Sequence, residues 1–162
     1  MAAVDLPILI VGDVHGDIER LVAALKPYPA EEWRTIFLGD LVDYGMFGVG
    51  VMRLARDRPN TDVLLGNHEV AMLSALRDPS RVGFYISIGG QQHDLDELRK
   101  DELLQGWMQA RPLILKLEDN TLVQHCGNDY SSSPKRLRCR RGRQCQCIHS
   151  ERGVVARSDR CR

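Results

Sequence analysis

The sequence predicts an α/β fold in which short parallel strands alternate with helices. Three apolar runs, at residues 8–11, 35–38 and 62–65, each lead directly into a glycine that is followed by polar residues. Short apolar runs that end at a glycine are typical of buried strands with both faces covered. The segments between the runs are long enough for crossover helices, and loops after parallel strands meet at one edge of the sheet. The three glycine loops are therefore expected to converge.

The first crossover helix is expected from Asp17 to Lys26. An aspartate at this position can cap a helix by accepting a backbone N–H bond. The apolar residues that follow have helical spacing, so they should form one buried face. The residues expected on this face are Ile18, Leu21, Val22 and Leu25.

Three further helices are expected downstream. A glycine-broken loop over 44–50 precedes a short helix over 51–56, and a helix over 70–77 packs against the sheet. The charged segment 95–104 is expected to form an exposed helix over the site, and His93 to be a solvent-exposed loop residue.

Two strands are expected near the end of this region. Residues 113–117 and 121–123 are apolar runs separated by Glu118, Asp119 and Asn120, a pattern typical of a hairpin with a tight turn. The second strand leads to His125, which is thereby brought to a strand end like the earlier polar residues.

The polar residues at the strand ends are of metal-binding type. Asp13 and His15 lie in the first glycine loop, Asp40 in the second, and Asn67 and His68 in the third. Carboxylate, amide and imidazole ligands together suit Mn²⁺, Fe or Zn²⁺ better than Ca²⁺ or a thiolate-bound zinc. A shared carboxylate would hold two ions about 4 Å apart. The alternative is that each motif is only a turn, but three motifs at three strand ends favour a metal site.

The motifs GDVHGD (12–17), GDLVDYG (39–45) and GNHE (66–69) resemble those of the calcineurin-like metallophosphoesterases. The similarity is to the branch that holds the Ser/Thr protein phosphatases and their bacterial and phage relatives. Weaker matches at GGQQ (89–92) and LVQHCG (122–127) extend the resemblance to roughly residues 8 to 130. It implies a β-sandwich flanked by helices, incomplete on its C-terminal side.

The resemblance also implies a site with two divalent ions. Asp13, His15 and Asp40 would hold the first ion. Asp40, Asn67 and His125 would hold the second, with Mn²⁺ as the expected metal and Fe or Zn²⁺ as alternatives. A hydroxide bridging the ions would attack phosphorus in line.

The same resemblance assigns the catalytic residues. His68 would protonate the leaving oxygen, while Asp43 would orient its imidazole and keep it protonated. Gly16 and Gly45 would let the backbone pass close to the ions.

Tyr44 departs from the family pattern. In the resembled phosphatases an arginine at this position grips the substrate phosphate. A tyrosine hydroxyl can donate one hydrogen bond but cannot form a bidentate, charged clamp. This difference favours a small phosphorylated molecule or a diester over a phosphoprotein, unless Tyr44 merely packs on its loop.

The composition changes after residue 133. Residues 134–162 contain ten Lys or Arg and two Asp or Glu, a charge of +8, so residues 1–133 carry −8 in a chain whose charges sum to zero. Four of the five cysteines also lie in 134–162. We therefore expect a partial catalytic domain over 1–133 and a basic, Cys/Arg-rich tail without stable structure.

Three interpretations of the tail remain open. Its arginines could bind nucleic acid, although no aromatic residue after Tyr130 is available for stacking. It could bind zinc through Cys139, Cys145, Cys147 and His149, although their spacing matches no established ligand pattern. It could also result from a frameshift or a truncated reading frame. The last interpretation agrees with the lack of a Gly-His pair after Gly127, since the resembled family has such a histidine in its second metal site.

The function predicted is therefore metal-dependent hydrolysis of a phosphate ester. Two alternatives are a weakened remnant that binds metal and phosphorylated ligand without turnover, and a nucleic-acid-binding protein that acts through the tail. The first apolar run is too short for a signal peptide or membrane span, so we expect a cytoplasmic protein without a membrane partner. The substrate is expected to be a phosphorylated small molecule or phosphoprotein, and the sequence leaves the oligomeric state open.

Overall fold

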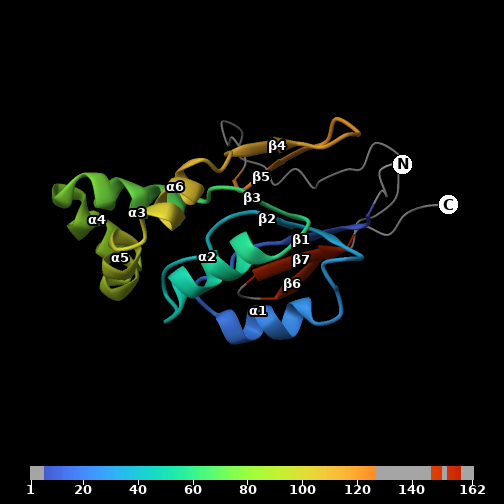
Figure 1. The fold of residues 1–162 in the computed structure, drawn as a ribbon, viewed down its shortest axis with the longest axis horizontal. Coiled ribbons are helices and arrows are strands. Elements are labelled where there is room, and N and C mark those ends of the chain that lie inside the picture. Colours follow the sequence, from blue (N-terminus) through green and yellow to red (C-terminus); the bar gives the residue numbers. More distant parts are fainter. Residues whose placement is uncertain (1–5, 127–146, 151–152, 158–162) are drawn as a thin grey trace.

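A five-stranded sheet with the order β3-β2-β1-β7-β6 forms the centre of the structure (Figure 1). The structure is a computed structural model that describes residues 6–126, 147–150 and 153–157. The three predicted strands are parallel neighbours, with Ile10 opposite Ile36 and Ile36 opposite Asp62. Their bounds are Ile8–Val11 for β1, Arg34–Phe37 for β2 and Thr61–Val63 for β3.

Two strands of this sheet come from the basic tail. β7 (Gly153–Arg157) pairs antiparallel with β1, and β6 (Cys147–Ser150) pairs antiparallel with β7. The expectation that residues 134–162 have no stable structure is therefore wrong for these two segments, which belong to the central sheet. A strand needs only a free neighbouring edge to form its ladder, and β1 offers one on the side away from β2. The domain boundary at residue 133 stays a prediction, and Cys139, Cys145 and Cys161 lie outside the described residues.

Two helices cover one face of the sheet. α1 (Ile18–Leu25) and α2 (Gly48–Asp57) pack on Leu9, Val11 and Phe37. Asp17 caps α1 as predicted, because its side chain accepts the N–H of Arg20 at 3.0 Å.

Two details of these helices differ from the prediction. Val22 does not belong to the buried face, since it is 53% exposed while Leu21 and Leu25 are buried. α2 begins at Gly48, three residues before its expected start, because the N–H of Val49 is capped by the Asp94 carboxylate from a distant part of the chain.

A β-hairpin covers the opposite face of the sheet. β4 (Ile114–Lys116) and β5 (Leu122–Gln124) pair antiparallel, as predicted, and Val123 packs on Ile36 and Leu64. Successive residues of a strand point to opposite faces. Ile36 accordingly faces the hairpin and Phe37 faces the helices. The predicted sandwich of two sheets flanked by helices is thus confirmed.

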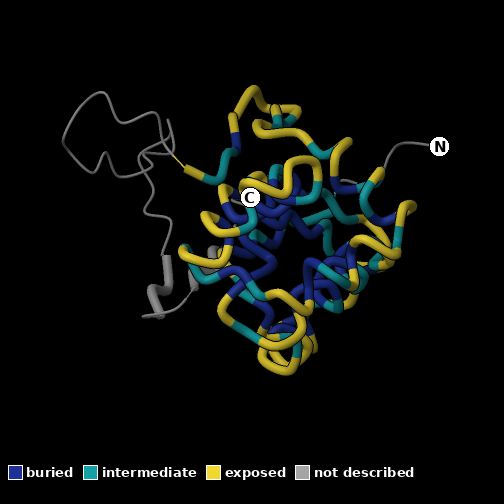
Figure 2. The backbone as a smooth tube through the Cα atoms, turned by 90° about the vertical axis from the view of Figure 1, so that its left-hand side faces the viewer, coloured by how far each residue is buried: buried dark blue, intermediate teal, exposed yellow. Residues whose placement is uncertain are grey.

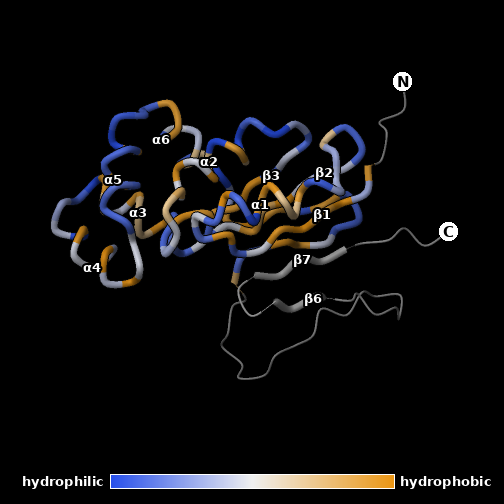
Figure 3. Tube along the Cα trace, turned by 90° about the horizontal axis from the view of Figure 1, so that it is seen from below, coloured by the Kyte–Doolittle hydropathy of each residue, from blue (hydrophilic) through white to orange (hydrophobic). Residues whose placement is uncertain are grey.

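The remaining helices gather at one end of the molecule (Figure 1). Buried residues concentrate in the interior of the fold, and the first three strands form a largely apolar group, with further apolar segments in the helices (Figures 2 and 3). Among the described residues, no helix is both long and apolar enough to cross a membrane. The helices of this end are α3 (Asn67–Arg77), the 3₁₀ turn Pro79–Arg81, α4 (Val82–Ser87), α5 (Gln92–Arg99) and α6 (Glu102–Gln109).

The expected exposed helix over 95–104 was a wrong prediction. The segment forms parts of two helices, and α6 starts anew because the Asp101 side chain accepts the N–H of Leu104. Leu95, Leu98 and Leu104 are fully buried, so the charged residues between them form only the outer face. His93 is exposed, as predicted, but it lies in the first turn of α5 and not in a loop, and its Nε2 donates to the carbonyl of Met46 at 2.9 Å.

Two neighbouring residues of α1 test this packing. Leu21→Ala should lower the free energy of unfolding by about 2–5 kcal/mol, because it removes a buried side chain and leaves a cavity. Val22→Ala should change it by less than about 0.5 kcal/mol, because Val22 faces solvent. Urea unfolding followed by circular dichroism measures both, and equal losses would contradict the assigned face.

Candidate metal centre

The loops after β1 and β2 are joined through their backbones. The N–H groups of Val14 and His15 both donate to the carbonyl of Asp40, at 2.9 and 3.0 Å, and the N–H of Gly16 donates to the carbonyl of Leu41 at 2.8 Å. Gly16 and Gly45 touch at this junction, where a Cβ on Gly45 would lie 2.3 Å from the His15 carbonyl oxygen. Neither loop can therefore move without the other.

Glu69 joins the second loop to the third. Its carboxylate is fully buried and accepts the backbone N–H groups of Asp40 and Leu41 at 2.7 Å, Val42 at 3.3 Å and Gly66 at 2.8 Å. Burial, together with the nearby Asp40 carboxylate, raises the pKa of Glu69. The sequence interpretation missed this residue, although a glutamate three residues after the start of a helix is typical of a capping box.

The first group of potential metal ligands consists of Asp13, Asp40 and His125, whose ligand atoms all lie within 4.8 Å of one another. His125 Nε2 lies 3.1 Å from Asp40 Oδ2 and 2.9 Å from the side-chain oxygen of Asn67. The bond to Asp40 raises the pKa of His125. Burial acts to raise the pKa of Asp40, but its bonds from His125 and the His68 N–H outweigh burial and lower it.

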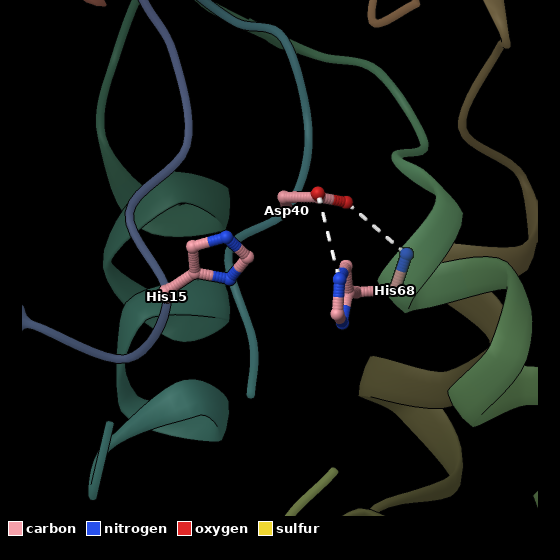
Figure 4. A group of neighbouring side chains, drawn as sticks. All are labelled: His15, Asp40 and His68. Atoms are coloured by element: carbon pink, nitrogen blue, oxygen red, sulfur yellow. Dashed lines mark hydrogen bonds and ion pairs between the residues drawn. The ribbon is translucent and has the colours of Figure 1, made fainter. Parts of the chain in front are cut away.

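A second group, formed by His15, Asp40 and His68, shares Asp40 with the first (Figure 4). His15 Nδ1 donates to the carbonyl of Val42 at 3.0 Å, which leaves its Nε2 for the centre. The backbone N–H of His68 donates to Asp40 Oδ1 at 3.1 Å, and His68 Nε2 lies 4.0 Å from Asp40 Oδ2. Two ligand groups thus meet at one carboxylate.

The residues of both groups suit divalent ions. Oxygen and imidazole donors together fit Mn²⁺, Fe or Zn²⁺. Among the described residues, the buried Nδ1 of His125 has no hydrogen-bond partner, although a buried polar atom normally has one. It lies 3.9 Å from the Asp13 carboxylate, too far for a hydrogen bond and close enough for a shared ligand. The structure therefore brings together all five residues that the sequence proposes as ligands.

A buried hydrogen-bonded chain orients His68. Its Nδ1 donates to Asp43 Oδ2 at 2.6 Å, and the Tyr85 hydroxyl donates to Asp43 Oδ1 at 2.6 Å. Burial raises the pKa of Asp43, against the effect of these two bonds. Burial also raises the pKa of Tyr85, and the Asp43 carboxylate adds to this, so the phenol stays a proton donor. Sequence reasoning missed Tyr85, because no local pattern links it to Asp43.

The backbone of the centre is held in an uncommon conformation. Four of its non-glycine residues have positive φ, namely His15 at 50°, Asp40 at 52°, Asp43 at 73° and Tyr44 at 58°. Non-glycine residues are uncommon in this region, although Asp and His occupy it more often than most, and such residues cluster at functional sites.

A pocket of about 600 Å³ opens beside the centre. Tyr44 is 62% exposed at its edge, with its ring centroid 4.9 Å from that of His15 and 5.4 Å from that of His68. The residues that line the pocket are Tyr44, Asn67, His68, Ala71, Phe84, Ile86, Ser87, Ile88 and Gly89.

Comparisons with known proteins agree with this geometry. The family model for calcineurin-like phosphoesterases matches residues 6–147. The chain is 32% identical over 127 residues to a symmetrical bis(5'-nucleosyl)-tetraphosphatase of Enterobacter sp. (strain 638), covering 73% of the chain and 42% of that protein. It is 32% identical over 91 residues to a serine/threonine-protein phosphatase 4 catalytic subunit of Candida glabrata, covering 52% of the chain and 28% of that protein.

Solved structures show the same fold. The crystal structure of a putative diadenosine tetraphosphatase superimposes with a TM-score of 0.60 at 21% identity, covering 96% of the chain and 66% of that structure. A protein serine/threonine phosphatase from Saccharomyces cerevisiae superimposes with a TM-score of 0.56 at 20% identity, covering 78% of the chain and 39% of that structure. The chain thus spans less than half the length of the curated relatives that it matches.

Glu69→Gln tests the link between the loops. The amide replaces one acceptor oxygen by an NH₂ group that faces backbone donors, so the variant should lose about 2–4 kcal/mol of unfolding free energy. Glu118→Gln, on an exposed turn, is the matched control and should keep the wild-type midpoint in urea. A Glu69→Gln protein with wild-type stability would show that the buried carboxylate does not hold the loops.

Proposed function

The chain belongs to the calcineurin-like phosphoesterase family, and we propose that it hydrolyses phosphate esters with divalent metal ions. The observation that carries this proposal is the position of Asp40, which is shared by two groups of metal ligands beside an imidazole oriented by a buried carboxylate. Because the chain spans only part of its curated relatives, its activity and substrates are inferred from its own site.

The proposed ligand sets are those that the sequence resemblance implies, and the structure gathers their residues around Asp40. Asp13, His15 and Asp40 would hold one ion, and Asp40, Asn67 and His125 the other. Mn²⁺ is the proposed metal, with Fe or Zn²⁺ as alternatives, since the donors are carboxylate, amide oxygen and imidazole. Ions in such a site lower the pKa of water and stabilise the charge that develops on phosphate oxygens.

His68 is the proposed proton donor to the leaving oxygen. Its Nδ1 is held by Asp43 at 2.6 Å, and its Nε2 lies 4.0 Å from Asp40 Oδ2 and so faces the centre. Tyr85 fixes Asp43 from the other side and occupies its second oxygen. Asp43 and Tyr85 are therefore positioning residues for His68.

The substrate class proposed is a small phosphorylated molecule or a diester. Tyr44 borders the centre at the position where the sequence resemblance leads us to expect an arginine, and a tyrosine cannot form a bidentate clamp for phosphate there. A phosphoprotein substrate and nucleic-acid binding through 134–162 are the less favoured proposals. The cytoplasmic location stays a prediction.

Hydrolysis of p-nitrophenyl phosphate and of its bis-ester with added Mn²⁺ tests the proposed function. We expect metal-dependent hydrolysis that falls at least about 100-fold in Asp40→Asn, because Asp40 belongs to both ligand groups. Asp57→Asn, at an exposed position, is the control and should retain activity. Absence of activity in a folded protein that binds one ion or none would instead identify a remnant without turnover.

The leaving group distinguishes two roles of His68. If His68 is the proton donor, His68→Asn should lower hydrolysis of phenyl phosphate by about 10²–10⁴-fold but that of p-nitrophenyl phosphate much less, because p-nitrophenolate needs no proton to leave. The content of bound Mn²⁺ should be unchanged, and His93→Asn should match wild type. Equal loss on both esters together with loss of an ion would assign His68 as a metal ligand.

A further inference from the structure

The pocket beside the centre is uncharged apart from His68. It shares Asn67 and His68 with the centre and is otherwise lined by aromatic, aliphatic and small residues, with no lysine, arginine, aspartate or glutamate among them. Since His68 is the proposed proton donor, the pocket begins where the leaving oxygen of a bound ester would lie. It is therefore placed to receive the leaving group.

The walls of this pocket are exposed aromatic and aliphatic side chains. Tyr44 is 62% exposed, Phe84 60% and Ile86 40%, and all three come from the loop after β2 or from α4. Large apolar residues exposed singly are ordinary, whereas a contiguous group beside polar residues marks a binding site. These side chains gather next to the only imidazole that lines the pocket.

The ring of Tyr44 is held in a fixed position. Its backbone N–H donates to the carbonyl of Gly89 at 3.0 Å. A Cβ on Gly89 would lie 2.4 Å from the Tyr44 ring, so the ring lies directly on the glycine backbone. The Tyr44 ring therefore forms a flat wall of the pocket that is already in place before a ligand binds. The Phe84 ring lines the same pocket.

The lining also excludes certain leaving groups. A second phosphate needs positive charges or several N–H donors to replace its hydration, and the pocket supplies neither lysine nor arginine. A polyphosphate chain would therefore find no cationic side chain of lysine or arginine to balance its charge there. A flat apolar ring, in contrast, gains burial and contacts with aromatic faces.

We propose that the pocket binds an aromatic ring carried directly on the leaving oxygen, so that the preferred substrate is an aryl phosphate without a second phosphate group. This inference rests on the proposed function for the position of the leaving oxygen. The volume of about 600 Å³ accommodates a ring, since a cavity of about 150 Å³ already holds benzene.

Binding of phosphonates, which cannot be hydrolysed, tests the pocket independently of turnover. Calorimetry on the Mn²⁺-loaded chain compares benzylphosphonate, cyclohexylmethylphosphonate and methylphosphonate, which share the charged group. We expect benzylphosphonate to bind at least about tenfold more tightly than methylphosphonate and more tightly than the cyclohexyl compound. Equal binding of benzyl- and methylphosphonate, no binding of either, or preference for the cyclohexyl compound would overturn the proposal.

Substitutions at Phe84 locate the effect. Phe84→Ala should remove most of the preference for benzylphosphonate, while Phe84→Tyr should keep it because the ring remains. Phe47→Ala is the matched control, since Phe47 is 55% exposed and does not line the pocket. Preference unchanged in Phe84→Ala would contradict the assignment of the pocket. A preference for the ring without any hydrolysis would support the proposed pocket and overturn the proposed function. Hydrolysis without a preference for the ring would support the proposed function and overturn the proposed pocket.

Discussion

The whole centre depends on one buried carboxylate that is not itself a proposed ligand. Glu69 accepts four backbone N–H groups from two loops that are far apart in sequence. Burying a carboxylate is costly unless its oxygens are hydrogen-bonded, and here one donor is the Gly66 N–H at the start of α3 and the other three are N–H groups of the loop after β2. The same interaction therefore begins the helix that carries Asn67 and His68 and fixes the loop that carries Asp40.

Asp40 extends this constraint to the first loop and to the hairpin. Its N–H donates to Glu69, its carbonyl accepts from Val14 and His15, and its side chain contacts His68 and His125. With every polar group engaged, the left-handed conformation of Asp40 is held from all sides. A side chain so fixed needs little reorganisation to hold a charge, which is what electrostatic catalysis requires.

The sequence predicted the parts of the fold that depend on local pattern. The strands β1 to β5, the cap of α1 and the polar residues of the three glycine loops each lie in a short run of local pattern, so the convergence of these loops followed from the strand ends, whereas His125 as a ligand rested on the resemblance and β6 and β7 were not predicted. Tyr85 was missed because its partner Asp43 lies in another element, and the local capping-box pattern of Glu69 does not reveal its bonds to the loop after β2. The exposed position of Val22 and the burial of Leu95 and Leu98 likewise depend on which helix packs against which neighbour, and spacing within one helix does not specify that.

The two sides of the site are built by different means, and this has a consequence for specificity. On the ligand side, the side chains of Glu69 and Asp40 each make several bonds within and between the loops, so replacing either one disturbs several hydrogen bonds at once. The pocket side consists of exposed side chains from α4 and of Tyr44, whose replacement costs little stability. Sites that bind a leaving group can therefore change while the chemistry at Asp40 is retained, which is how one fold comes to act on different substrates. In this chain the pocket side carries aromatic and aliphatic side chains and neither lysine nor arginine.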